Sequence, residues 1–274
     1  MSPGSNLENP ARPSAPLIGI LDSGVGGFSV LREIHQLIPG ASIRYVGDSA
    51  WCPYGTKSAE AICDRVMTIA DSLLDWGAQI LVIACNSATI HAVGPLRATY
   101  PLPIVGMEPG VKPAAEVTRS GVIGVLATEA SIAGEKFHRL VHNHADGVRV
   151  ITRPCPRFVD LVESGTLEGP ETENAVEEAL APLLAEGADT IVLGCTHYPF
   201  LRPVIETQVP EGMTLIETGA AVAKRVASLL PSVSDSVEES SEIHIETTGE
   251  LATLEQLFPK LLPGIEATLS QCDL

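Results

Sequence analysis

The sequence contains no long hydrophobic run. Its longest unbroken apolar stretch is Ile80 to Cys85, only six residues, whereas a membrane-spanning helix needs about 20. The first sixteen residues are polar and rich in proline and do not have the apolar core of a secretory signal. We therefore predict no membrane partner, and we interpret residues 1–16 as a disordered tail.

Basic residues are also scarce. Lys and Arg number 17 against 34 Asp and Glu, which gives a net charge of −17 at pH 7. A negative field of this size repels nucleic-acid phosphates and anionic lipid, so neither is an expected partner. If the substrate is an anion, the site must hold it with backbone N–H groups rather than with a basic patch.

The cysteines do not form the dense pattern of a small disulfide-rich domain. Six cysteines are spread over 274 residues: Cys52, Cys63, Cys85, Cys155, Cys195 and Cys272. Together with the missing export signal, this favours free thiols in a reducing compartment, the cytoplasm. Apolar residues make up 45% of the chain and charged residues 19%, which excludes wholesale disorder. The length allows one large domain or two modest ones.

Short apolar runs alternate with amphipathic stretches along the chain. The expected strands are Leu17–Asp22, Ile43–Asp48, Gln79–Ala84, Pro103–Gly106, Val122–Ala127, Val148–Thr152, Thr190–Gly194, Thr214–Glu217 and Ile243–Thr247. The expected helices are Phe28–Ile38, Ser58–Trp76, Thr89–Thr99, Ser131–Val141, Pro170–Glu186, Ala220–Leu230 and one from Leu251. The strands lack period-2 alternation, which favours parallel sheets with helices on both faces, an α/β fold.

The chain also resembles itself. Residues 19–21 (GIL) recur as residues 124–126 (GVL), an offset of 105, and residues 77–86 align with residues 187–196, an offset of 110. Similar sequences at similar offsets indicate two homologous α/β halves.

The repeat places a cysteine at the carboxyl end of a strand in each half, Cys85 and Cys195. Ligands bind at this edge of open α/β sheets, and we expect nearby helix N–H groups to favour the thiolate. A single cysteine is usually core filler. Two at equivalent positions instead suit a reaction that removes a Cα proton from one face of a substrate and returns one to the other.

Two further segments are candidate binding loops. Asp22-Ser23-Gly24-Val25-Gly26-Gly27 ends the first strand; its glycines allow close approach of a ligand, and Asp22 could orient or deprotonate a thiol. The segment matches neither GxGxxG nor a Walker motif, which argues against a nucleotide site. Pro53-Tyr54-Gly55 follows the second strand, where the alternative is an ordinary tight turn.

A histidine follows the second thiol at close spacing. His197 lies two residues after Cys195 and could share a proton with it. The same pair could instead be the nucleophile and base of an amidase, although that would leave Cys85 without a role. His138, His142 and His144 have zinc-like spacing but no partnering Cys or carboxylate motif, so we expect exposed histidines and no metal.

With these residues in place, the sequence resembles the glutamate racemases of the cofactor-independent aspartate/glutamate racemase superfamily from about Ile18 to Phe258. The motifs that carry the resemblance are ILDSGVGGFSVL, DSAWCPYG, LVIACNSAT, IVGMEPG, PCPRFVDLVESG and IVLGCTHYPFL. It implies interconversion of L- and D-glutamate without pyridoxal phosphate or metal, which supplies D-glutamate for peptidoglycan precursors.

The resemblance also implies an architecture. Two pseudo-symmetric α/β domains enclose the active site in the cleft between them, and the C-terminal segment returns to the first domain. In this sequence the first domain would comprise residues 17–108 plus 218–274, and the second residues 109–217. Members of the family often form homodimers, so a homodimer is possible.

The resemblance assigns roles residue by residue. Cys85 would take the proton from D-glutamate with the help of Asp22, and Cys195 would act on L-glutamate with the help of His197. The substrate contacts would be Asp22, Ser23, Pro53, Tyr54, Gly55, Asn86, Ser87, Thr128 and Thr196, with Glu163 near the second thiol.

Two positions depart from the usual family pattern. Ser87 replaces a threonine, which keeps the hydroxyl, and residues 127–131 (ATEAS) replace a glycine- and threonine-rich turn, which leaves Glu129 near an anion site. The alternatives are a two-thiol racemase for aspartate or a hydantoin, a hydrolase that uses Cys195 alone, and a binding-only regulator. His197 favours glutamate over aspartate, because aspartate racemases carry an acidic residue there.

Overall fold

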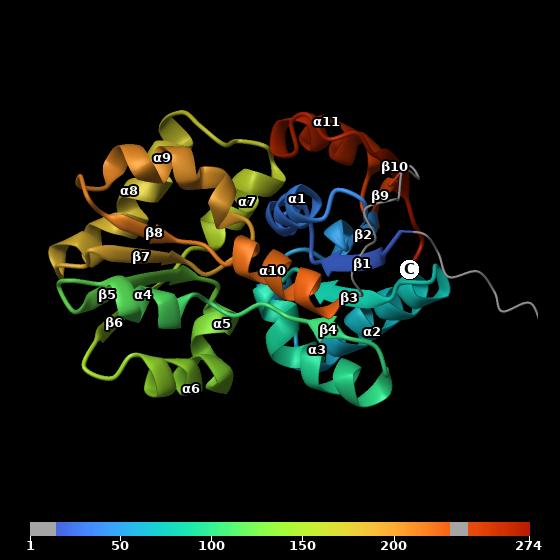
Figure 1. Ribbon diagram of the computed structural model, residues 1–274. Coiled ribbons are helices and arrows are strands. Elements are labelled where there is room, and N and C mark those ends of the chain that lie inside the picture. The colour runs from blue at the N-terminus through green and yellow to red at the C-terminus, as the bar shows by residue number, and fades with distance from the viewer. Residues whose placement is uncertain (1–14, 231–240) are drawn as a thin grey trace, which may run out of the picture.

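The structure is a computed structural model that describes residues 15–230 and 241–274, and it divides into two α/β domains (Figure 1). All strand pairs in both sheets are parallel, as the sequence predicted. Most of the predicted tail, residues 1–14, lies outside the described residues. Ala15 and Pro16 are buried, and the Ser42 N–H donates to the Pro16 carbonyl at 2.9 Å.

The first domain contains a six-stranded sheet of order β10-β9-β2-β1-β3-β4. The strands are β1 (Leu17–Asp22), β2 (Ser42–Gly47), β3 (Ile80–Ile83), β4 (Ile104–Val105), β9 (Ile243–Thr247) and β10 (Thr268–Gln271). The helices are α1 (Phe28–Leu37), α2 (Ala59–Asp75), α3 (Asn86–Thr99), α10 (Gly219–Leu229) and α11 (Leu251–Leu261), with short 3-10 turns η1 (Ser49–Trp51) and η2 (Tyr54–Thr56). Helices α1 and α11 lie on one side of the sheet, and α2 and α3 on the other (Figure 1).

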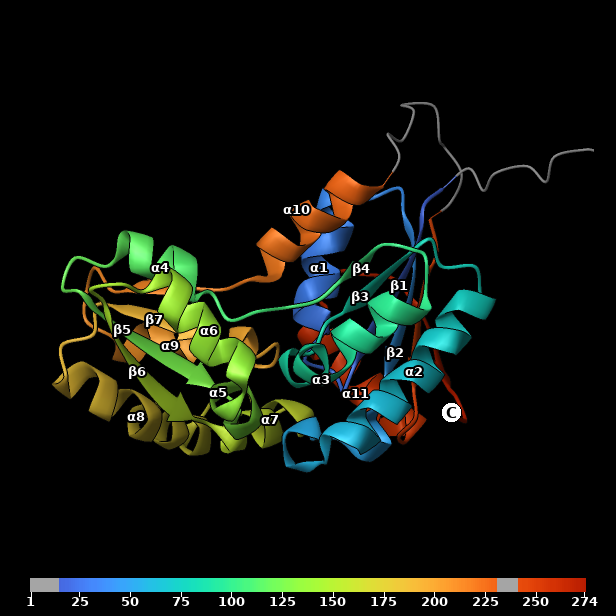
Figure 2. The same cartoon turned by 90° about the horizontal axis from the view of Figure 1, so that it is seen from below.

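The second domain contains a four-stranded sheet of order β6-β5-β7-β8. The strands are β5 (Val122–Ala127), β6 (Arg149–Pro154), β7 (Thr190–Leu193) and β8 (Thr214–Ile216). The helices are α4 (Val111–Val117), α5 (Glu129–Ala133), α6 (Glu135–His144), α7 (Pro156–Glu163), α8 (Pro170–Ala185) and α9 (Arg202–Gln208), with the 3-10 helix η3 (Tyr198–Leu201). Figure 2 shows α4 and α6 on one side of this sheet and α8 on the other.

The sheets confirm the internal repeat. The order β2-β1-β3-β4 in the first sheet corresponds to β6-β5-β7-β8 in the second. The paired residues match as well, since Leu21 lies opposite Ile83 and Leu126 lies opposite Leu193. Each cysteine therefore comes two residues after the end of an equivalent strand.

Central strands in both sheets are buried on both faces. All residues of β3 (ILVI) and β7 (TIVL) are buried, which explains their unbroken apolar or β-branched character. One hydrophobic cluster includes Phe28 of the first domain and Phe158 of the second, so the apolar core continues from one domain into the other.

The observed helices differ from the expected ones in some boundaries and in number. The helix predicted over Ser131–Val141 is divided into α5 and α6 at Gly134, a residue of low helix propensity. The helix predicted from Thr89 begins at Asn86, because Cys85 is its N-cap. Helices α4, α7 and α9 were not predicted, and each has only seven or eight residues. Strand β10 was not predicted either.

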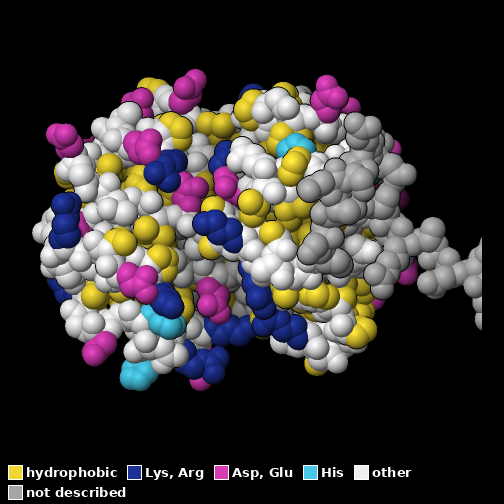
Figure 3. All heavy atoms as spheres, in the orientation of Figure 1, with side chains coloured by type: hydrophobic (Ala, Val, Ile, Leu, Met, Phe, Trp, Pro, Cys, Tyr) yellow, Lys and Arg dark blue, Asp and Glu magenta, His cyan; other side chains and the backbone are white. Residues whose placement is uncertain are grey.

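Within the described residues, no helix is long and apolar enough to cross a membrane. On the face drawn in Figure 3, acidic and basic side chains are interspersed. All six cysteines are free, as expected.

Candidate active site

Both strand-end cysteines line one small cavity. Its walls are formed by Ser23, Pro53, Tyr54, Gly55, Cys85, Asn86, Ser87, Thr128, Val159, Cys195, Thr196 and His197. Every predicted site residue except Asp22 and Glu163 is in this set, and Val159 was not predicted. The volume is about 20 Å³, which is room for a water molecule but not for an amino acid. A molecule as large as an amino acid could enter only if the cavity walls separated.

The first thiol sits at the start of a helix. Cys85 is the N-cap of α3, and its sulfur accepts a hydrogen bond from the Ala88 N–H at 3.4 Å. The sulfur also lies 3.6 Å from the Ser23 hydroxyl oxygen. Burial raises the pKa of Cys85 to about 12, and the nearby charge of Asp22 adds to this effect. The expectation of a favoured thiolate was wrong for Cys85, because desolvation outweighs the helix N–H groups.

The second thiol differs from the expectation in its backbone. Cys195 is followed by a turn and the 3-10 helix η3, so no α-helix begins at this cysteine. The turn instead brings the His197 ring back to the sulfur, and Nδ1 lies 3.6 Å from the Cys195 sulfur. The two thiols therefore have different partners, a helix N-terminus in one domain and an imidazole in the other.

The far side of the His197 ring is hydrogen-bonded to a carboxylate. Glu163, the last residue of α7, accepts a hydrogen bond at Oε1 from His197 Nε2 over 2.7 Å. Burial alone would lower the pKa of His197, but its hydrogen bonds with Cys195, Cys52 and Glu163 raise it well above the ordinary value. Burial alone would raise the pKa of Glu163, but the His197 hydrogen bond and charge lower it. The pair is therefore an imidazolium and a carboxylate at neutral pH.

The glycines after β1 make room for this pair rather than for a ligand. A Cβ atom at Gly24 would overlap the Glu163 carboxylate, and one at Gly26 would overlap the His197 ring. At Gly27 it would press on Asp22 and Tyr45. The predicted reason for the glycines, close approach of a ligand, was wrong, because protein side chains fill the space above them.

Asp22 is fully buried at the end of β1. Its Oδ2 accepts hydrogen bonds from the Gly27 N–H at 2.8 Å and from the Tyr45 hydroxyl at 3.3 Å. Its Oδ1 has no partner among the described residues, and burial raises its pKa. No hydrogen bond joins Asp22 to Cys85 in the described structure; the neighbouring Ser23 makes that contact.

A hydrogen-bond network anchors the loop after β2. The Tyr54 hydroxyl donates to Asp48 Oδ2 at 2.6 Å. Arg65 and Thr248 also donate to the Asp48 carboxylate. This fully buried carboxylate fixes Tyr54 at the cavity wall.

Residues of the two domains also meet across the cavity. The hydroxyls of Ser87 and Thr128 lie 3.2 Å apart, and Thr128 caps α5. The side-chain amide of Asn86 is buried with no partner for Nδ2 or Oδ1 among the described residues. Glu129 is exposed.

A third thiol was missed by the sequence analysis. Cys52, to which we assigned no role, places its sulfur 3.6 Å from Glu163 Oε1. Its position directly before the Pro53-Tyr54-Gly55 loop was the available signal. His138, His142 and His144 are exposed, as predicted.

Comparison with known proteins identifies the family. The Asp/Glu/Hydantoin racemase family matches residues 18–226. The glutamate racemase of Ectopseudomonas mendocina is 49% identical over 247 residues, which cover 89% of this chain and 94% of that protein.

Solved structures agree with this relationship. The Escherichia coli glutamate racemase in complex with L-glutamate and the activator UDP-MurNAc-Ala has a TM-score of 0.85 and 32% identity, covering 94% of this chain and 98% of that one. The Francisella tularensis glutamate racemase in complex with D-glutamate has a TM-score of 0.81 and 26% identity, with coverage of 95% and 98%. Since the family match spans most of the chain and the relatives agree over nearly its whole length, the chain belongs to the Asp/Glu/Hydantoin racemase family.

Proposed function

We propose that the chain is a glutamate racemase that interconverts L- and D-glutamate with two cysteine bases. The observation that carries the proposal is the shared cavity of Cys85 and Cys195, which follow equivalent strands of the two domains. Two thiols that approach one carbon from opposite sides can exchange its proton without moving the substrate. The similarity to glutamate racemases over most of the chain supports the choice of substrate.

The reaction balances with two protons. From L-glutamate, the Cys195 thiolate takes the Cα proton, and the Cys85 thiol gives its proton to the opposite face. D-glutamate leaves, with Cys195 now a thiol and Cys85 a thiolate, and the reverse direction restores the starting form. The raised pKa of Cys85 fits the donor role, because the free protein then holds this sulfur as a thiol at neutral pH.

The assisting groups are asymmetric. On the Cys195 side, the His197 imidazolium lies against the sulfur and can exchange a proton with it, while Glu163 holds the ring. On the Cys85 side, Ser23 contacts the sulfur, and Asp22 keeps one buried oxygen without a partner. We propose that this oxygen accepts a hydrogen bond from the substrate ammonium group when the cavity opens.

The described lining of the cavity contains neither Lys nor Arg, and its imidazolium, His197, is already paired with Glu163. We therefore propose that uncharged groups hold the substrate's carboxylates. The groups available are the hydroxyls of Ser23, Ser87, Thr128 and Thr196, the Asn86 amide and the first N–H groups of α3. A helix N-terminus with free N–H groups is a suitable anion site. We propose that Pro53, Tyr54 and Gly55 form the wall that closes over the bound substrate.

Further predictions accompany this function. We propose residues 17–108 plus 218–274 and residues 109–217 as the domains that separate to admit glutamate. We further propose that the product supplies peptidoglycan precursors in the cytoplasm and that no cofactor takes part. A homodimer stays a prediction that sedimentation can test.

Incubation of L-glutamate in deuterium oxide tests the function. We expect deuterium at Cα and loss of optical rotation without release of ammonia. Release of ammonia would support the Cys195 hydrolase instead, and turnover of L-aspartate in place of L-glutamate would support an aspartate racemase.

Single replacements test the two-thiol scheme. Cys85→Ser and Cys195→Ser should each lower kcat at least a thousand-fold, about 4 kcal/mol in activation free energy. Cys63→Ser, in the half-buried thiol of α2, is the matched control. Full racemisation by Cys85→Ser would exclude the scheme, and loss of activity only in Cys195→Ser would indicate a hydrolase.

A further inference from the structure

The third thiol completes a group of possible metal ligands that includes His197 of the proposed active site. Cys52 Sγ, a carboxylate oxygen of Glu163 and a ring nitrogen of His197 all lie within 4.8 Å of one another. Cys52 and Glu163 are partly buried, and His197 is buried. Sulfur, nitrogen and oxygen donors together are the ligand types that Zn²⁺ uses in proteins. The site is empty.

Two of the three ligand separations can be compared directly with those around a tetrahedral ion. Zinc bond lengths place S and O ligands roughly 3.6 Å apart and N and O ligands roughly 3.4 Å apart. The Cys52 sulfur already lies 3.6 Å from Glu163 Oε1. His197 Nε2 and Oε1 are 2.7 Å apart because a proton joins them, so the ring must withdraw by roughly 0.7 Å when an ion replaces that proton.

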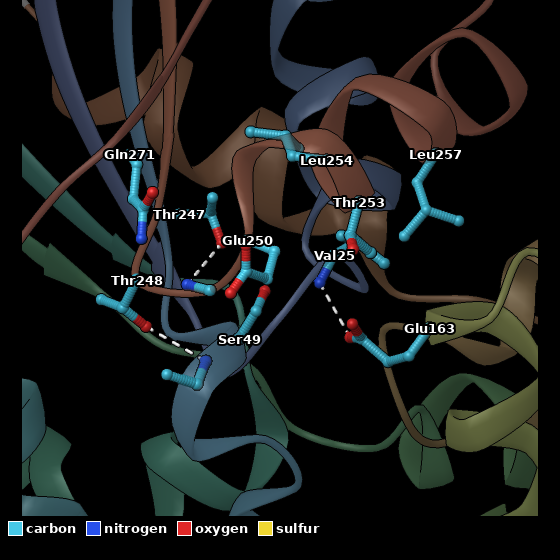
Figure 4. A pocket seen from close by; sticks show the side chains of 12 residues that line it. Val25, Ser49, Glu163, Thr247, Thr248, Glu250, Thr253, Leu254, Leu257 and Gln271 are labelled. Carbon is cyan, nitrogen blue, oxygen red and sulfur yellow. Dashed lines mark hydrogen bonds between the residues drawn. The ribbon is translucent and has the colours of Figure 1, made fainter.

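Glu163 also lines a second cavity, which shares no lining residue with the substrate cavity. The volume of this second cavity is about 420 Å³, and Val25, Glu163, Glu250, Thr253 and Leu257 are among its walls. Figure 4 shows the Glu163 side chain at this cavity, with one oxygen bonded to the Val25 N–H. All recorded hydrogen bonds of the Glu163 carboxylate go to Oε1, so Oε2 remains available within the described structure.

The walls of this second cavity favour a cation. Two carboxylates, Glu163 and Glu250, and the hydroxyls of Ser49, Thr247, Thr248 and Thr253 line it, and no Lys or Arg of the described chain does. The net charge of −17 adds to the attraction. A hydrated cation can therefore reach Glu163 without passing the substrate cavity.

We propose that Cys52, Glu163 and His197 form an inhibitory site for a thiophilic divalent cation such as Zn²⁺. Binding forms bonds to the three side chains, releases the protons of the Cys52 thiol and of His197 Nε2 to solvent, and leaves water in the fourth position. The bound ion separates Glu163 from His197, which removes the proton exchange at Cys195. This consequence for turnover rests on the proposed function, whereas binding itself does not.

Cobalt binding tests the site without any assay of turnover. In the Cys85→Ser/Cys195→Ser double variant, Co²⁺ should bind with one equivalent and give a sulfur-to-cobalt charge-transfer band in the near ultraviolet. Adding Cys52→Ser should abolish the band, and adding Cys63→Ser should not. Cys52→Ala serves as a second variant, and circular dichroism checks that each one folds. A band that survives both replacements of Cys52 would overturn the proposal.

Zinc inhibition tests the consequence. In the full chain, zinc should lower kcat and leave KM for glutamate nearly unchanged, because the ion enters by the second cavity. Relative to each variant's own zinc-free rate, Cys52→Ser should raise the inhibitory concentration at least tenfold, whereas Cys63→Ser should match the wild type. Inhibition of Cys52→Ser at the wild-type concentration would place zinc on the substrate-cavity thiols and overturn the proposal. If the protein has no racemase activity, the cobalt band still shows whether Cys52 binds the metal.

Discussion

The imidazole ring of His197 packs on the backbone of Gly26, at a distance that leaves no room for a Cβ atom. Gly26 precedes α1 in the first domain, and His197 follows β7 in the second, so the contact crosses between the domains. Gly24 makes the same kind of contact with Glu163. The backbone of the first domain therefore packs against the Glu163–His197 pair that lies beside the thiol of the second domain.

Gly26→Ala should displace the His197 ring from the Cys195 sulfur. Because a misplacement of about 1 Å can cost about 100-fold, we expect kcat to fall by ~10- to 100-fold. Gly40→Ala is the control, since a Cβ atom there meets nothing within 4 Å. Steady-state kinetics on both variants measure the effect, and an unchanged kcat for Gly26→Ala would show that the ring position is unimportant.

Glu163→Gln should retain a hydrogen-bond acceptor for His197 but remove the charge. The pKa of His197, now held well above its ordinary value, should then fall, and imidazole NMR titration can follow it. We expect kcat to fall about tenfold or more, because the ring becomes a weaker partner for Cys195. Glu168→Gln, at an exposed position beyond α7, is the matched control. If the His197 pKa stays where it is, the carboxylate does not hold the imidazolium.

Tyr54→Phe should loosen the wall of the substrate cavity. The variant loses the 2.6 Å hydrogen bond to Asp48, while Arg65 and Thr248 still satisfy that carboxylate. We expect a loss of about 1–2 kcal/mol in the free energy of unfolding and a several-fold rise in KM with a smaller change in kcat. Tyr100→Phe, whose hydroxyl donates to Asp71 at an exposed site, is the control. A fall in kcat at constant KM would give Tyr54 a role in the chemical step instead.

Alkaline pH should destabilise the protein through its buried thiols. Burial raises the pKa of Cys155 from its ordinary value of 9.0 to about 12. Its contribution to stability is therefore complete below pH 9 and is lost as the pH rises toward 12, because the unfolded chain ionises first. One such group contributes a slope of about 1.4 kcal/mol per pH unit in this window.

Cys155→Ala should make the free energy of unfolding fall less steeply with pH, by the contribution of one thiol. Urea unfolding at several pH values between 8 and 11 measures this slope. Val176→Ala, a buried replacement in α8 without a titratable group, should lower the free energy of unfolding equally at each pH. Equal slopes for wild type and Cys155→Ala would mean that this thiol does not keep its proton in the folded protein.

The sequence by itself determined the fold class and the equivalent positions of the two cysteines in the two domains. Strands β3 and β7 are buried on both faces, and such strands must be apolar or β-branched throughout, which makes them visible in the sequence. The repeat then predicted that Cys85 and Cys195 follow equivalent strands, and the paired residues of the sheets confirm this. Boundaries such as the break at Gly134 were missed, because one glycine changes local propensity without changing the hydrophobic period.

Only the tertiary structure decided what surrounds each thiol. Burial depends on the packing of both domains, so the high pKa of Cys85 could not follow from its place at a helix N-terminus. Cys52 and Glu163 are 111 residues apart in the chain, and no local pattern brings them to 3.6 Å. The sequence specifies strands and helices through short-range periodicity, whereas the contacts of Glu163, His197 and Cys52 arise where the two domains meet.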